Sequence, residues 1–196
     1  MSATAAHPSP VLADLVPGAR IKDIALVLSG TVLLTIAGQI AIPLWFTPVP
    51  LSLATFAVLL SGAALGPAKA GLSVLLYIAI GAAGAPMFAD QASGWAFASF
   101  GYILGYLPAA IVVGALARKR ADRSLLATVA MALLGSLIIY AAGLPWLMAF
   151  LGVDLATGLK LGVYPFLAGD IIKAIAAALL LPTTWKLITT ARSKRT

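Results

Sequence analysis

The chain has 196 residues, of which 62% are hydrophobic and 10% are charged, and its net charge is +7. Soluble domains carry about 25% charged residues, so a soluble protein of this length could not cover this much apolar surface. The basic residues lie at the ends of apolar stretches, which excludes a nucleic-acid-binding domain, and the lack of cysteine excludes disulfides and thiolate chemistry. We interpret the chain as an all-α integral membrane protein that folds as one bundle.

The first 19 residues are polar and rich in alanine and proline. They lack the basic segment followed by an apolar stretch that marks a signal peptide, so residues 1–19 are predicted to be a disordered cytoplasmic tail. Residues 20–190 are the predicted membrane domain, and residues 191–196 are a predicted basic cytoplasmic tail.

Six membrane-spanning helices are predicted from the apolar stretches and the residues that interrupt them. About 20 apolar residues cross the hydrocarbon core, and the charge-free stretch 24–68 is long enough for two crossings separated by prolines. Gly101 and Gly105 would allow a close helix contact in the fourth helix. The predicted helices cover residues 22–42, 51–66, 69–85, 98–117, 124–142 and 165–188.

The loop charges orient this bundle, because basic residues concentrate in cytoplasmic loops. Lys160 falls on one side alone, and Lys173 lies within the last helix. Both termini are predicted to be cytoplasmic, on the side that carries Arg20, Lys22, Lys69, Arg118, Lys119, Arg120, Arg123, Lys186, Arg192, Lys194 and Arg195. The outer loops 43–50, 86–97 and 143–165 are long enough to cover an outward-facing pocket.

The sequence offers little for enzymatic chemistry. The histidine count is one, at His7, the chain contains no glutamate, and its aspartates are scattered, so neither a Ser-His pair within the membrane nor a metal site is expected. No G-x-x-x-x-G-K-[ST] phosphate-binding loop is present, so the chain is not expected to hydrolyse ATP. We predict no catalytic residues, no metal and no cofactor, and favour binding or transport.

One acid and one base stand three residues apart within the last apolar helix. Asp170 and Lys173 share a helical face. Because a charge at membrane depth costs about 2.5–3.5 kcal/mol, the two charges require a compensating interaction. One interpretation is a ligand site, in which Asp170 accepts N–H donors and Lys173 donates to a carbonyl or carboxylate. The other is a self-neutralised ion pair that serves packing alone.

Three segments, in this order, resemble a known family of membrane proteins. They are residues 48–52 followed by 59–67, residues 77–88 followed by Gly101, Tyr102 and Gly105, and residues 165–173, which read PFLAGDIIK. Together they resemble the BioY family, the biotin-specific S components of energy-coupling-factor (ECF) vitamin transporters. The resemblance covers roughly residues 43–182.

The resemblance implies capture of biotin from outside the cell membrane. Asp170 and Lys173 are implied to hold the ring end of biotin, and a cyclic urea indeed offers N–H donors to a carboxylate and a C=O to an ammonium. The apolar part of biotin would suit Phe46, Trp95, Tyr102 and Phe166, and further hydrogen bonds could come from Ser52, Ser99 and Tyr102.

The chain departs from the family pattern around the far end of the ligand. Ile103 stands where some members have a basic residue, and Ala54, Ala98 and Phe100 replace other common residues. The contacts to the ligand carboxylate are therefore open, with Gln91, Ser93 and Lys160 as candidates.

The resemblance also implies partners, since S components carry no motor. They act with a transmembrane coupling protein and two ATPase subunits and are thought to topple in the membrane to release substrate. Ala25 and Ser29 in the first helix are the implied docking residues. The alternatives are an S component or stand-alone carrier for another vitamin-like ligand, and a structural membrane protein without a transport role.

Overall fold

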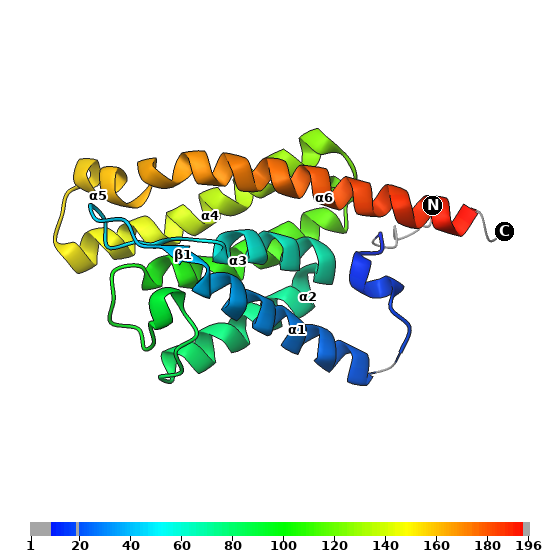
Figure 1. The fold of residues 1–196 in the computed structure, drawn as a ribbon, viewed down its shortest axis with the longest axis horizontal. Helices are drawn as coiled ribbons and strands as arrows, with labels where there is room; N and C mark the ends of the chain where they lie inside the picture. The colour runs from blue at the N-terminus through cyan, green and yellow to red at the C-terminus, as the bar shows by residue number, and fades with distance from the viewer. Residues whose placement is uncertain (1–8, 19, 194–196) are drawn as a thin grey trace, which may run out of the picture.

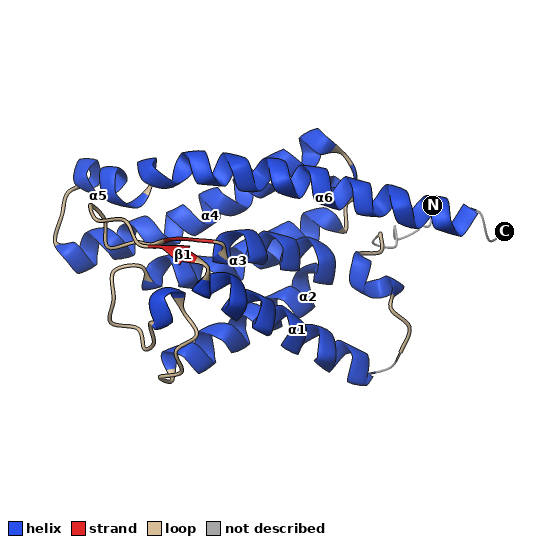
Figure 2. Cartoon of the chain, in the orientation of Figure 1, coloured by secondary structure: helices blue, strands red, loops and turns tan. Residues whose placement is uncertain are grey.

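The computed structural model describes residues 9–18 and 20–193, and these residues are mostly helical (Figure 1; Figure 2). Neighbouring helices pack in the order α1, α2, α3, α4 and α6, which places α3 in the middle of the molecule. The bounds are α1 (Arg20–Gln39), α2 (Ala54–Ala82), α3 (Phe100–Ala117), α4 (Leu125–Leu151), α5 (Leu155–Gly162) and α6 (Leu167–Ser193). Short 3-10 turns lie at η1 (Leu12–Leu15), η2 (Ala89–Gln91), η3 (Ala121–Arg123) and η4 (Tyr164–Phe166).

Five helical stretches of the described residues are long and apolar enough to cross a membrane. Their outward faces carry large apolar side chains such as Ile36, Leu137 and Leu179, each more than half exposed. Such faces would be unfavourable in water and are suited to lipid. The chain is therefore a multi-pass membrane protein, with stretches at Arg20–Gln39, Ala54–Ala82, Phe100–Ala117, Leu125–Leu151 and Leu155–Ala191.

Helix α2 consists of two arms joined at Gly66, which has non-helical angles (φ 77°, ψ 173°) and precedes Pro67. A side chain added to Gly62 would meet Val113 of α3, whereas one added to Gly71 would meet Ile111, so α2 follows α3 in one direction and then returns. The reversal is visible in Figure 1. The arms match the helices predicted at 51–66 and 69–85.

A small two-stranded sheet, which the all-helical prediction missed, follows α1. Strands β1 (Ala41–Ile42) and β2 (Leu51–Ser52) pair antiparallel, with Ala41 opposite Ser52. The hydroxyl of Thr47, in the connecting loop, donates a hydrogen bond of 2.7 Å to the carbonyl of Leu161. The sheet ends α1 three residues earlier than predicted and fixes the loop 43–50 against α5.

The predicted outer loop 143–165 is wrong over most of its length, because α4 continues to Leu151 and α5 follows. Pro145 is accommodated inside α4. Gly152 then ends the helix in a left-handed conformation (φ 66°), and the Asp154 side chain caps α5 by accepting from the Thr157 N–H at 3.0 Å. The predicted helix ended at residue 142, before Pro145, whereas the observed end of α4 and start of α5 are marked by Gly152 and Asp154.

Residues 9–18 differ from the predicted disordered tail, while residues 1–8 and 19 lie outside the described part. Val11 is fully buried within an apolar cluster, and the Asp14 carboxylate pairs with Arg118 at 3.1 Å. The Arg123 guanidinium donates to the carbonyl of Pro10 at 3.0 Å. The segment therefore covers the end of the bundle where α3 meets α4. At the other terminus, α6 extends to Ser193, into the predicted basic tail.

Asp122 in η3 is a fully buried carboxylate at this same end. It accepts a hydrogen bond from the indole N–H of Trp185 in α6, and Arg123 lies over the Trp185 ring at 4.0 Å. Burial raises the pKa of the Asp122 carboxyl, against the opposing effects of the Trp185 hydrogen bond and of nearby Arg123 and Arg120. The contact ties the α3–α4 connection to α6.

We predict that Asp122→Ala lowers the free energy of unfolding by about 1–3 kcal/mol, because the indole N–H of Trp185 loses its buried acceptor. Asp122→Asn keeps an acceptor without the charge. Since the folded-state pKa is raised, the stabilisation from the carboxyl is complete below its ordinary pKa and is lost as the pH rises through the raised value. The free energy of unfolding of the Asn variant should therefore rise relative to that of the native protein from acidic to neutral pH.

Thermal unfolding of the purified proteins in detergent, followed at acidic and neutral pH, measures both effects. Equal stability of the Ala variant and the native protein at both pH values would contradict this role for Asp122.

Candidate ligand-binding site

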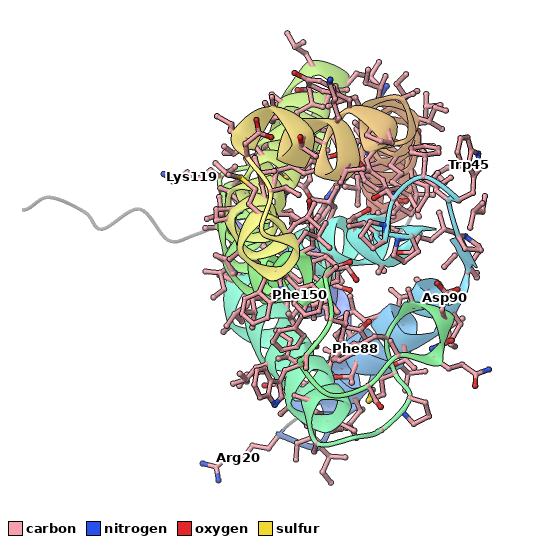
Figure 3. All side chains as sticks on the ribbon, turned by 90° about the vertical axis from the view of Figure 1, so that its left-hand side faces the viewer. Arg20, Trp45, Phe88, Asp90, Lys119 and Phe150 are labelled. Carbon is pink, nitrogen blue, oxygen red and sulfur yellow. The ribbon has the colours of Figure 1, made fainter. Side chains whose placement is uncertain are left out.

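A cavity lies at the end of the bundle that carries the β1–β2 loop and α5. Figure 3 looks at this end and places Phe88 among the helices, with Trp45 and Asp90 at the periphery. The cavity wall comes from β2, α2, α3, α4 and α6, together with the loop between α2 and α3. Residues far apart in the chain therefore converge on one space.

Helix α6 supplies the two charged residues of the wall. Its inward face carries the buried residues Ala174, Ala177 and Leu181, whereas Ile171 and Ile172 are exposed. Asp170 and Lys173 fall on the inward face by the same helical spacing, and they are only 7% and 9% exposed. The face that packs the bundle therefore also carries both charges into the cavity.

Asp170 and Lys173 form a buried ion pair with hydroxyl partners on both sides. The Lys173 ammonium lies 3.6 Å from the Asp170 carboxylate and donates a hydrogen bond of 2.7 Å to the Thr55 hydroxyl. The Tyr140 hydroxyl donates to the Asp170 carboxylate at 2.5 Å. A hydroxyl of α2 and a hydroxyl of α4 thus hold the two charged groups, and each charge has more than one partner.

The pair still has capacity for a ligand. A carboxylate offers about four acceptor positions, of which Tyr140 and Lys173 use two, and an ammonium offers three donors, of which Asp170 and Thr55 use two. A ligand group that carries N–H donors next to a carbonyl could bind to both residues at once. Such a group would be neutral and would leave the charge balance of the cavity unchanged.

The cavity also has an aromatic wall. The Phe88 ring makes edge contacts with Tyr77 at 5.2 Å and with Phe100 at 6.2 Å between ring centroids. A side chain at Gly81 would collide with the Phe88 ring, so this glycine gives the ring its place. Phe97 and Phe166 also line the cavity, so its wall combines a polar cluster with aromatic rings.

The structure brings six of the eight predicted ligand residues to the cavity wall: Ser52, Ser99, Tyr102, Phe166, Asp170 and Lys173. Tyr102 also has a structural contact, because its hydroxyl donates to the carbonyl of Gly162 at 2.9 Å. Phe46 and Trp95 do not line the cavity. They are 43% and 63% exposed, because the loops that carry them turn outward.

Several residues of the wall were not predicted from the sequence: Thr55, Tyr77, Phe88, Phe97, Tyr106, Ser136 and Tyr140. Tyr140 carried a signal that could have been read, since it is a hydroxyl within the long charge-free stretch 124–153. Ser136 and Thr55 are likewise hydroxyl residues within the charge-free stretches 124–153 and 24–68, but the sequence does not show which of these hydroxyls meet α6. The candidates Gln91, Ser93 and Lys160 are exposed and do not line the cavity.

The predicted docking residues lie on the outer face of α1. Ala25 and Ser29 are both exposed, and the Ser29 hydroxyl donates to the Ala25 carbonyl at 2.7 Å. The Ser29 hydroxyl is therefore satisfied within the helix. Exposed Ile21, Leu28 and Val32 flank them.

The comparisons with known proteins agree on one family. The model of the BioY family matches residues 8–190. The probable biotin transporter BioY of Pyrococcus horikoshii is 37% identical over 164 residues, which are 82% of this chain and 94% of that protein. The biotin transporter BioY of Thermotoga maritima is 35% identical over 153 residues, 76% and 88% of the two chains.

A solved structure has the same fold. The crystal structure of the S-component for biotin from an ECF-type ABC transporter aligns with a TM-score of 0.76 and 25% identity. The alignment covers 85% of this chain and 92% of that one.

We predict that the two charges stabilise the fold only as a pair. Lys173→Met leaves the buried Asp170 carboxylate without its cation and should cost on the order of 3 kcal/mol of unfolding free energy. The double variant Asp170→Asn/Lys173→Met removes both charges and should recover most of that loss. Thermal unfolding in detergent measures the cycle, and additive losses from the two substitutions would show that the residues act independently.

Proposed function

The chain belongs to the BioY family, and we propose that it is the S component that binds biotin from outside and delivers it across the cytoplasmic membrane. It is a transporter subunit and not an enzyme. The observation that carries the proposal for the site is the buried Asp170–Lys173 pair, which lines a cavity and keeps free hydrogen-bonding positions. The curated relatives are biotin transporters by name.

The chemistry of biotin suits the polar and the aromatic parts of the cavity wall. Its cyclic urea carries two N–H groups, which Asp170 would accept, and one carbonyl, to which Lys173 would donate. Its thioether ring and alkyl chain are apolar and would lie against the aromatic wall around Phe88 and Phe166. Tyr140 and Thr55 would hold the charged pair in place while the ligand binds.

A six-crossing arrangement with both termini in the cytoplasm is also part of the proposal. The two arms of α2 support six crossings, because the chain reverses at Gly66. The orientation is supported by the end opposite the cavity, where Lys69 pairs with Asp23 at 3.1 Å and Arg118 pairs with Asp14. Basic residues gather at that end, as the cytoplasmic side of a membrane protein requires.

The sequence contains no phosphate-binding loop, which is consistent with an energy source in other subunits. We propose a transmembrane coupling protein and two ATPase subunits as the partners. Ala25 and Ser29 would form the docking surface on α1, since small exposed residues allow another helix to approach closely.

Calorimetry of biotin binding to the purified chain in detergent tests the proposed ligand, with riboflavin and thiamine as comparison ligands. Tight binding of biotin alone is expected. We predict that Asp170→Asn weakens biotin binding by about 100-fold, because charge-assisted hydrogen bonds to the urea are lost.

The matched control for this variant is Asp154→Asn, which changes a carboxylate outside the cavity and retains a good helix cap. Its biotin affinity should equal that of the native chain. Unchanged affinity in a folded Asp170→Asn variant would refute the site.

For the docking surface, we predict that Ala25→Leu with Ser29→Leu abolishes assembly with the coupling subunits and biotin uptake, while biotin binding to the isolated chain stays unchanged. The bulky side chains would block the close approach of a partner helix. Ala141→Leu, which alters an exposed alanine on α4, is the control and should assemble normally. Co-purification and uptake assays measure both, and normal assembly of the double variant would contradict this surface.

A further inference from the structure

The cavity carries no positive charge that is free to pair with a ligand. Of the described residues that line it, Asp170 and Lys173 are the ones with a formal charge, and they pair with each other at 3.6 Å. The remaining polar groups of the wall are neutral hydroxyls: Ser52, Thr55, Tyr77, Ser99, Tyr102, Tyr106, Ser136 and Tyr140. The net formal charge of the wall is therefore zero.

A ligand carboxylate is a poor match for Lys173 in this arrangement. Any anion within hydrogen-bonding distance of the Lys173 ammonium would lie close to the Asp170 carboxylate, because those two groups are already 3.6 Å apart. Like charges at such separation repel strongly in a buried site. The pair therefore selects a neutral group with both donors and an acceptor, which leaves an anionic end of the ligand to point elsewhere.

The rest of the cavity wall offers the carboxylate no cation. Outside the Asp170–Lys173 pair, the wall consists of aromatic rings such as those of Tyr77, Phe88 and Phe97 and of neutral polar and apolar groups. Lys160 is the basic residue of the predicted outer loops, but it is exposed in the last turn of α5 and is not part of the wall. Lys69 and Arg118 lie at the opposite end of the bundle and pair with aspartates.

We propose that the cavity recognises the neutral ring end of biotin and forms no ion pair with its carboxylate, so that uncharged esters and amides of biotin are also ligands. The inference rests on the proposed function and extends the substrate class from biotin to its neutral carboxyl derivatives. The carboxylate, in this arrangement, lies towards the open mouth and keeps its water. Replacing it with an ester or an amide then removes no protein contact that depends on charge.

The loss of affinity on replacing the carboxylate with an ester or amide shows whether the carboxylate forms an ion pair with the protein. A hydrogen bond to a charged group contributes enough that its loss weakens binding by about 10- to 100-fold. We therefore expect biotin methyl ester and biotinamide to bind within about threefold of biotin. An ester that binds more than about tenfold weaker would overturn the proposal.

The experiment is calorimetry of the full chain in detergent with biotin, biotin methyl ester and biotinamide, followed by competition of each derivative against bound biotin. One-to-one displacement is expected and places all three at the same site. If the derivatives bind without displacing biotin, the inference fails while the proposed function stands. If biotin itself does not bind to folded protein, the proposed function fails and the inference falls with it.

Two variants test further whether the carboxylate of biotin has a cationic partner. Lys160→Gln should leave the affinities for biotin and for its ester unchanged, and a selective loss for biotin would identify Lys160 as the partner of the carboxylate and overturn the proposal. Asp170→Asn should weaken binding of all three compounds by a similar factor, since they share the ring end. A loss confined to biotin in this variant would also contradict the inference.

Discussion

The ion pair between Asp170 and Lys173 is the constraint on which the rest of the site depends. Two charges in an apolar helix are tolerable only where they neutralise each other and where hydroxyl groups complete their hydrogen bonds. Thr55 of α2 and Tyr140 of α4 supply these contacts, so the site exists only when three helices are assembled. Because the pair has unused hydrogen-bonding positions, it can bind a ligand in addition to making the contacts that packing requires.

The surrounding packing keeps this end open and the other end closed. Gly101 and Gly105 let α4 approach α3, since a side chain at either would collide with Trp146 or Ile139. At the opposite end, Val11 and the Asp122–Trp185 contact seal the junction of α3, α4 and α6. A substrate-binding subunit that must present its ligand to one side of the membrane at a time needs this asymmetry.

Much of this arrangement could be predicted from the sequence, because its signals are local. Hydropathy gives the apolar stretches, the i, i+3 spacing puts Asp170 and Lys173 on one face, and Gly66-Pro67 marks the reversal in α2. The β1–β2 sheet, the packing of residues 9–18 and the pairing of Thr55 and Tyr140 with the two charged residues could not be predicted. They depend on contacts between distant parts of the chain, and no local or periodic pattern in the sequence indicates such contacts.

The structure of the chain with biotin bound tests the central claim most directly. The account predicts a urea nitrogen about 2.7–3.2 Å from an Asp170 oxygen and the urea carbonyl at similar distance from the Lys173 ammonium. It also places the carboxylate at the cavity mouth. Biotin bound elsewhere, with the Asp170–Lys173 pair in contact only with Tyr140 and Thr55, would show that the pair serves packing alone and would contradict the account.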